Sequence, residues 1–120
     1  MQSEFITHNG KRIFIANYEN LNFEAFEKEI KTVTETLCGE PANSVLCINN
    51  TSGLMATPKV INLFIWSVGK TKPHISKAAV VGLGLSGTRK GLMDVILKAT
   101  QQTAQVFDDL EKAKDWMTQK

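Results

Sequence analysis

A glycine-rich segment comes closest to a chemical motif in this chain. Residues 82–87 read Gly-Leu-Gly-Leu-Ser-Gly, a G-x-G-x-x-G spacing whose glycines let backbone N–H groups approach a pyrophosphate at a helix N-terminus. Asp108 ends the next predicted strand about twenty residues further on, where a dinucleotide site places an acid. Too few strands follow the segment to complete a mononucleotide-binding half. We therefore expect a tight turn, with binding of an anion or phosphate as the alternative.

A polar segment, Asn49 to Gly53, follows the apolar run at 45–48. In open α/β sheets, ligands bind beyond the carboxyl ends of the strands, and the glycine-rich turn follows another predicted strand at that edge. We expect the two loops to be neighbours and to form one small polar cleft. The alternative is that the asparagine side chains only satisfy backbone groups of their own loop. The predicted cleft residues are Asn49, Asn50, Thr51, Gly53, Gly82, Gly84, Ser86 and Gly87.

Residue spacing reveals no catalytic or metal-binding constellation. His8 and His74 have no serine or cysteine and acid arranged around them for nucleophilic catalysis, and we expect both to be solvated in loops. Cys38 and Cys47 show no CxxC or Cys/His ligand spacing, which predicts reduced thiols. No carboxylates pair in a way that indicates acid–base chemistry. The sequence therefore predicts no enzyme, no metal site and no cofactor.

The composition predicts one folded domain spanning residues 1–120. The 42% apolar and 22% charged residues are typical of globular proteins, and 120 residues is an ordinary domain length. The net charge of +2 comes from interspersed charges, so we expect no nucleic-acid partner. Met1–Ile6 lacks the basic and apolar pattern of a secretory signal, and no run approaches the ~20 apolar residues that span a bilayer. We expect a cytoplasmic protein without stable membrane insertion.

The first part of the chain predicts a hairpin, a helix and a buried strand. Asn9-Gly10 favours a type I′ turn between strands at 5–8 and 11–16. Asn22 is the predicted N-cap of a helix whose apolar residues recur at helical spacing until Gly39 ends it. The continuous apolar run at 45–48 is typical of a central strand that is buried on both faces.

The remainder alternates helices and strands. Thr57-Pro58 predicts the start of a second helix that runs to about Gly69, and residues 77–83 predict a third buried strand. A turn at 84–87, a helix at 88–100 and a strand at 105–107 follow, before a final helix capped by Asp108. This order predicts an α/β domain with a mixed, mostly parallel sheet, an N-terminal β-hairpin and flanking helices.

The second predicted helix is unusually apolar. Between positions 59 and 69 only Asn62 and Ser67 are polar. At 100° per residue its apolar arc spans about 200°, wider than the roughly 100° that one core face needs, and Trp66 falls outside the arc. We predict that Leu63 and Trp66 form an interface with a protein partner or with a second copy, and we expect a homodimer. Internal packing against loops, or contact with a lipid or membrane, is the alternative.

Five stretches of the chain are similar to segments of known proteins. They are Asn43–Leu46, Thr51–Gly53, Thr57–Val60, Lys77–Gly82 and Val106–Trp116. They resemble small bacterial proteins of the SpoIIAA-like, or STAS-like, group, and the resemblance covers nearly the whole chain from the first predicted helix onward. Its most specific piece is VFDDLEKAKDW near the C-terminus. The resemblance implies a SpoIIAA-like fold, a (βα) superhelix on a mixed sheet, which CRAL-TRIO lipid-transfer domains also use. A shared fold does not by itself imply a shared function.

The resemblance also marks two hydroxyl side chains. In the anti-sigma-factor antagonists of that fold, a serine in an Asp-Ser-Ser/Thr-Gly pattern at the start of the second helix accepts a phosphate, which reverses binding to a partner kinase. The nearest positions here are Ser52, before Gly53, and Thr57, before Pro58, although the full pattern is absent. Ser52 and Thr57 are therefore candidate phosphate-accepting or anion-binding residues, because a helix N-terminus favours anions. A plain capping role for Thr57 is the alternative.

These features predict a non-enzymatic regulatory or protein-interaction module of the SpoIIAA-like type, which docks a protein partner or itself. The alternative is a carrier of a small ligand or lipid, comparable to the CRAL-TRIO use of the same fold.

Overall fold

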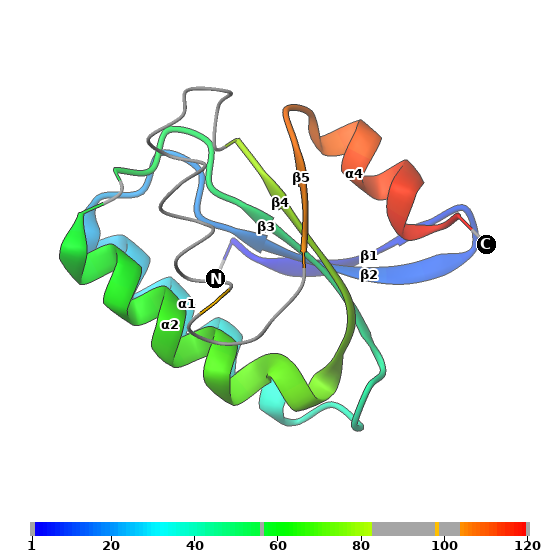
Figure 1. The fold of residues 1–120 in the computed structure, drawn as a ribbon, viewed down its shortest axis with the longest axis horizontal. Helices are drawn as coiled ribbons and strands as arrows, with labels where there is room; N and C mark the ends of the chain where they lie inside the picture. The colour runs from blue at the N-terminus through cyan, green and yellow to red at the C-terminus, as the bar shows by residue number, and fades with distance from the viewer. Residues whose placement is uncertain (1, 56, 83–97, 99–103, 120) are drawn as a thin grey trace.

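The computed structural model describes residues 2–55, 57–82, 98 and 104–119, and this part of the chain forms an α/β domain around a five-stranded sheet (Figure 1). The strands lie in the sheet in the same order as in the chain. The first two strands are antiparallel, and each later strand runs parallel to its neighbour, so the predicted mixed, mostly parallel sheet is confirmed. The strands are β1 (Glu4–His8), β2 (Lys11–Asn17), β3 (Val45–Asn50), β4 (Ile75–Val81) and β5 (Gln105–Phe107).

The N-terminal hairpin forms where the Asn-Gly pair predicts it. Asn9 and Gly10 have φ values of 50° and 79°, in the left-handed region that both central residues of a type I′ turn occupy. This turn sets the register of β1 on β2 and places Phe5 opposite Phe14. The two rings meet edge to face with their centroids 4.8 Å apart. This contact holds the two strands of the hairpin together, and Phe14 of β2 in turn pairs with Cys47 of β3.

The first two helices begin at side-chain caps that the sequence predicts. Asn22 Oδ1 accepts the N–H of Ala25 at 2.8 Å, and Thr57 Oγ1 accepts the N–H of Val60 at 3.3 Å. Both capping residues have extended backbone, which aims the side-chain oxygen at the first helical turn. The helices in the described chain are α1 (Phe23–Cys38), α2 (Pro58–Thr71), the short 3₁₀ helix η1 (Lys72–His74) and α4 (Leu110–Met117).

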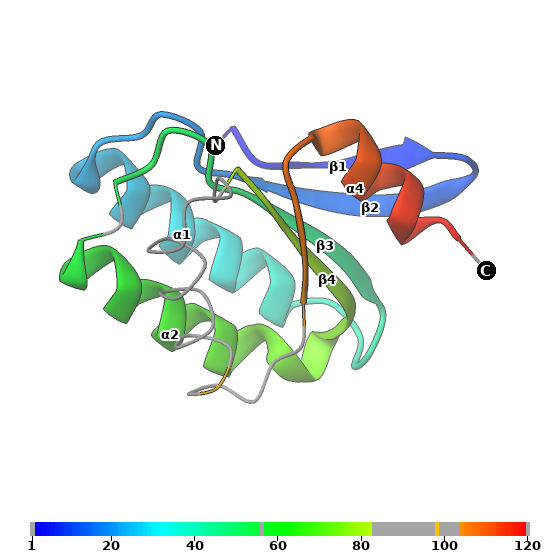
Figure 2. The same ribbon diagram turned by 45° about the horizontal axis from the view of Figure 1, so that its top comes forward.

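The helices lie in two layers. Helices α1 and α2 lie side by side on one face of the sheet, and α4 covers the opposite face (Figures 1 and 2). The larger core cluster fills the space between α1, α2 and the sheet, and includes Phe14, Tyr18, Phe26, Ile30 and Phe64. The smaller cluster lies under α4 and includes Ile13, Ile15, Ile48, Ala113 and Met117.

Several strand boundaries differ from the prediction. Asn49 and Asn50 continue β3, because they pair with Val80 and Val81 of β4, so the polar loop begins at Thr51. β4 itself begins and ends two residues earlier than predicted. The predicted turn at 84–87 and the predicted helix at 88–100 fall outside the part of the chain that is described, apart from residue 98.

The cap of the last helix also differs from the prediction. Asp109, not Asp108, is the N-cap of α4, and its Oδ1 accepts the N–H groups of Glu111 and Lys112 at 2.7 and 3.2 Å. The backbone of Asp109 is extended, which directs its carboxylate into the first turn. Asp108 instead lies 3.3 Å from the Lys112 ammonium.

Candidate interaction surface

The loops that follow β3 and β4 lie side by side at the carboxyl edge of the sheet. Thr51 Oγ1 donates a hydrogen bond to the carbonyl of Val81 at 2.9 Å, which ties the two strand ends together. Gly82 has a φ of +89°, and a Cβ atom at this position would lie 2.6 Å from the backbone of Ser52. Only glycine fits so close an approach.

The polar side chains at this edge are used by the loops themselves. Asn50 Nδ2 donates to Glu19 Oε2 at 3.4 Å, and Asn50 Oδ1 accepts the N–H of Ser52 at 3.2 Å. Gly53, with a φ of +72°, packs so closely against the side chain of Asn20 that a Cβ atom would collide with it. Within the described residues, every buried side-chain nitrogen and oxygen has a hydrogen-bond partner. The arrangement is that of a closed polar cluster that fixes the loop backbone.

The other residues of the predicted cleft are not all in this cluster. Asn49 is half-buried and lines an apolar cavity between the sheet and the helices. Gly84, Ser86 and Gly87 lie outside the described residues.

Ser52 and Thr57, the two candidate phosphate-accepting residues, have different surroundings. Ser52 is half-buried and lies against Gly82. Thr57 uses its hydroxyl oxygen to cap α2 through the N–H of Val60, so the capping role is confirmed. A phosphate on either side chain would change the charge at the edge of the sheet where α2 begins.

Two apolar hollows lie beside α2. The first, between the helices and the sheet, has a volume of about 40 Å³, close to that of a single water. The second has a volume of about 180 Å³ and lies between the first turns of α1 and α2. Both are smaller than the ~300 to 1,000 Å³ pockets that hold small-molecule ligands. The second hollow is lined by Leu21, Asn22, Phe23, Leu54, Met55, Thr57 and Val60.

Met55, at the rim of the second hollow, is an exposed apolar residue that sequence reasoning missed. Its exposed fraction is 72%. The sequence could have indicated this exposure, because it places a long apolar side chain in a loop, just before the capping residue Thr57.

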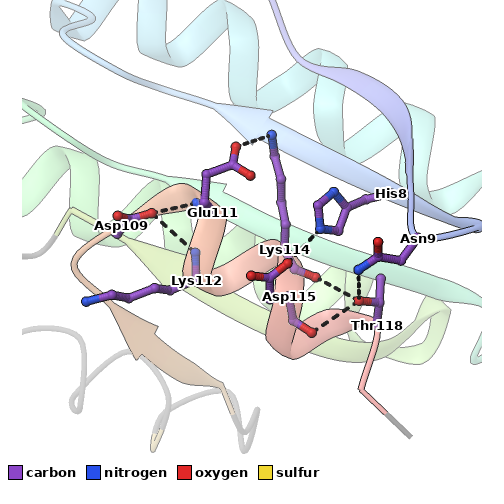
Figure 3. A network of polar contacts seen from close by, with 8 residues as sticks. All are labelled: His8, Asn9, Asp109, Glu111, Lys112, Lys114, Asp115 and Thr118. Carbon is purple, nitrogen blue, oxygen red and sulfur yellow. Dashed lines mark hydrogen bonds and ion pairs between the residues drawn. The ribbon is translucent and has the colours of Figure 1, made fainter.

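His8 is not solvated in a loop, so that prediction was wrong. It ends β1, and its Nε2 lies 2.9 Å from Asp115 Oδ1 of α4 (Figure 3). Beside it, Asn9 Nδ2 donates to Thr118 Oγ1 at 3.1 Å. These contacts join the hairpin turn to the end of α4 across 107 residues of sequence. They hold α4 in place over the smaller core cluster.

His74 and the cysteines also have defined surroundings. His74 lies in η1, not in a solvated loop, and its Nδ1 is 2.7 Å from the carbonyl oxygen of Glu40. Cys47 is buried in β3, and burial raises the pKa of its thiol to about 12. A catalytic cysteine needs the opposite shift. Cys38 is exposed, and its thiol lies 3.7 Å from the carbonyl of Lys70.

The buried face of helix α2 is narrower than the apolar arc of its sequence. The buried residues are Val60, Phe64, Ser67 and Thr71, which recur at a spacing of three or four. Ser67 belongs to this stripe because its hydroxyl lies 2.7 Å from that of Thr34 in α1. Thr71 belongs to it because its hydroxyl donates to the carbonyl of Ser67 at 2.9 Å. Two hydroxyl residues thus take core positions near the middle of the apolar arc.

Trp66 lies on the outer side of α2. Its exposed fraction is 39%, although it is one of the largest apolar side chains in the protein. Leu63, the other predicted interface residue, is half-buried and packs against the larger core cluster. The surface that α2 offers a partner is therefore centred on Trp66, with Leu63 at its base.

The charges of α2 are all positive. Lys59 and Lys70 are both exposed, and the helix contains no acidic residue. The ammonium of Lys70 lies 5.8 Å from the centre of the Trp66 ring, and that of Lys59 lies 5.6 Å from the Phe23 ring. Neither forms an ion pair with a carboxylate of the described residues. The helix therefore presents an aromatic ring between two cations.

The described residues show neither a membrane-spanning helix nor a metal-binding cluster. No helix among them has the length and apolar character needed to cross a membrane. No three His, Cys, Asp or Glu side chains among them gather where they could hold a metal ion. Comparison with family models, with curated proteins and with solved structures finds no match for this chain.

Proposed function

We propose that this protein is a non-enzymatic regulatory or protein-interaction module of the SpoIIAA-like type, and that it docks a protein partner through the outer face of α1 and α2. The observation that carries the proposal is the exposure of Trp66, 39% of which is accessible to solvent between two lysines. Tryptophan is among the residues most enriched at the energetic centres of protein interfaces. A partner that covered this ring would bury a large apolar area around a rigid anchor.

The arrangement of the strands supports the SpoIIAA-like assignment. Strands β2 to β5 follow one another in the sheet, and α1 and α2 lie on the same face (Figure 2). A superhelix of βα units has this topology. Cys38 and Cys47 are both free, which supports a place in the reducing cytoplasm.

A carrier of a small ligand or lipid is the second candidate. The cavity between the helices and the sheet favours it, because its lining is largely apolar and includes Phe64 and Val80. At about 40 Å³ this cavity would have to expand several-fold to hold a ligand of ordinary size. We therefore rank the interaction module first.

Amine cross-linking in cells tests the proposal. Lys28, Lys31, Lys59 and Lys70 supply exposed reactive amines on the two helices. Mass spectrometry should find cross-links from these lysines to another protein or to a second, isotopically distinguishable copy. Trp66→Asp should remove these cross-links while the urea midpoint stays close to that of the parent.

Met55→Asp is the matched control, because Met55 is also a large exposed apolar residue but lies beside the hollow between the helix N-termini. It should leave the cross-links in place. Unchanged cross-links in Trp66→Asp, or their loss in Met55→Asp alone, would overturn the proposal.

A further inference from the structure

We infer that the partner of the α1–α2 face is a second copy of this chain, in a twofold dimer in which α1 of each copy lies over α2 of the other. The inference rests on the proposed function and names the partner that docks there.

Four exposed charges have the same spacing on the two helices. Lys59 and Lys70 lie eleven residues apart on α2, and Glu24 and Glu35 lie eleven residues apart on α1. Eleven residues advance a helix by about 16 Å and return it to within about 20° of the same direction. Each pair therefore lies along one side of its helix. None of the four forms an ion pair within the described residues.

The two pairs of charges also lie within about one helical turn of each other along the helix axes. Both helices begin at the carboxyl edge of the sheet and run in the same direction (Figure 2). The Lys59 ammonium lies 5.6 Å from the ring of Phe23, the neighbour of Glu24. At the other end, Cys38 lies 3.7 Å from the carbonyl of Lys70, and Glu35 is about one turn before Cys38. Glu24 therefore lies within about one helical turn of the height of Lys59, and Glu35 within about one turn of the height of Lys70.

A twofold axis parallel to the helices, running between them, brings these charges together. It places α1 of the second copy over α2 of the first without a shift in height. Lys59 then faces Glu24 of the second copy, and Lys70 faces its Glu35. Symmetry repeats both contacts, so the interface contains four ion pairs.

The residues between the charged ends are also compatible with this arrangement. On α1 the outer positions between the two glutamates carry Lys28 and Lys31, whereas α2 carries Asn62 and Trp66 at the corresponding heights. Lys28 therefore lies near the amide of Asn62, and Lys31 near the ring of Trp66. Gly69 leaves space for side chains of the second copy, because a Cβ atom at this position would meet nothing within 4 Å.

The size of the face predicts a weak dimer. Helix α1 has 16 residues, so it is about 24 Å long, and two adjacent helices span about 20 Å. The face therefore measures roughly 480 Å² per copy, or about 960 Å² for the pair, which is below the ~1,200 Å² of stable interfaces and in the range of weak, transient ones. Exposed ion pairs are screened by salt, so dimerisation should weaken as ionic strength rises.

Sedimentation equilibrium with two charge-reversed variants tests the inference. Lys59→Glu/Lys70→Glu and Glu24→Lys/Glu35→Lys each place like charges across the interface, so each variant should be monomeric alone. Mixed in equal amounts, they should form a heterodimer, because all four ion pairs are restored with reversed sign. The parent should be a dimer at low salt. Lys11→Glu/Lys112→Glu, which changes the net charge by the same amount as the first variant at exposed positions outside α1 and α2, should remain a dimer.

A quadruple variant with all four charge reversals in one chain provides a second test. This test does not depend on the stability of either double variant. It should dimerise like the parent. A parent that is monomeric at low salt and high concentration, or a mixture that stays monomeric, would overturn the inference. If Trp66→Asp removes cross-links to another protein while the charge variants keep the parental mass, the partner is not a second copy, yet the proposed function stands.

Discussion

Thr34 of α1 and Ser67 of α2 share a 2.7 Å hydrogen bond inside the buried interface between the two helices. Thr34 Oγ1 also donates to the carbonyl of Ile30 at 2.6 Å, so the proton in the Thr34–Ser67 contact comes from Ser67. This polar contact lies among the buried side chains between the two helices. It fixes the height of α2 relative to α1, and with it the positions of Trp66 and the lysines on the outer face.

Removing this contact should destabilise the protein modestly. We expect Ser67→Ala to lower the free energy of unfolding by about 1 kcal/mol, the usual net value of a buried hydrogen bond. Thr34→Val/Ser67→Ala should cost less than the sum of the two single changes, because the second change removes a group that already lacks its partner. Urea unfolding of the four proteins measures this coupling. The exposed Thr32→Val is the control for the change of residue type, and strict additivity would argue against the contact.

The two cysteines should differ sharply in reactivity. Cys38 is exposed, whereas Cys47 is buried in the central strand. At pH 8 a thiol-specific reagent such as dithionitrobenzoate should titrate one thiol quickly in the native protein and the second only after denaturant is added. Cys38→Ser should abolish the fast phase, and Cys47→Val should abolish the slow one. Rapid modification of both thiols in the native parent would show that β3 is accessible.

Alkaline pH should destabilise the fold in a way that depends on Cys47. Burial raises the pKa of this thiol from 9.0 to about 12, so the unfolded chain loses the thiol proton before the folded chain does. Stability from this group is complete below pH 9 and falls between pH 9 and 12 by about 1.4 kcal/mol per pH unit. Burial also raises the pKa of Tyr18, which adds a loss in the same direction. Unfolding measured from pH 8 to 11 should show a shallower decline for Cys47→Val than for the parent. Parallel curves would contradict the prediction.

Two glycines should respond in opposite ways to alanine. Gly82→Ala should lower stability by more than 1 kcal/mol, because its φ is +89° and a Cβ would meet the Ser52 backbone at 2.6 Å. Gly69→Ala should raise stability by up to about 1 kcal/mol, because Gly69 lies inside α2 with open space around it. Thermal or urea unfolding under high salt, where the inferred dimer is weakest, measures both effects. A neutral Gly82→Ala would mean that the loops after β3 and β4 can separate.

Several features of this protein could be predicted from local sequence. Asn9-Gly10 indicated the hairpin, Asn22 and Thr57 indicated the helix starts, and the apolar run at 45–48 indicated the central strand. Each of these signals acts within a few residues, because turn geometry and helix capping depend on near neighbours. The exposure of Trp66 was also predictable, since it follows from the position of the ring outside the apolar arc of one helix.

The remaining features depend on contacts between residues far apart in the chain, which no local pattern encodes. The hydroxyl of Ser67 is satisfied inside the core because Thr34 of another helix accepts its proton, and His8 is held because α4 brings Asp115 to it. The polar loop at the edge of the sheet closes on Glu19 and Asn20, which belong to a different connection. Whether a polar side chain is solvated or satisfied inside the protein is decided by what the fold places next to it. For this reason the sequence determined the elements and their order, while only the tertiary structure decided which polar residues are used internally and which surface is left for a partner.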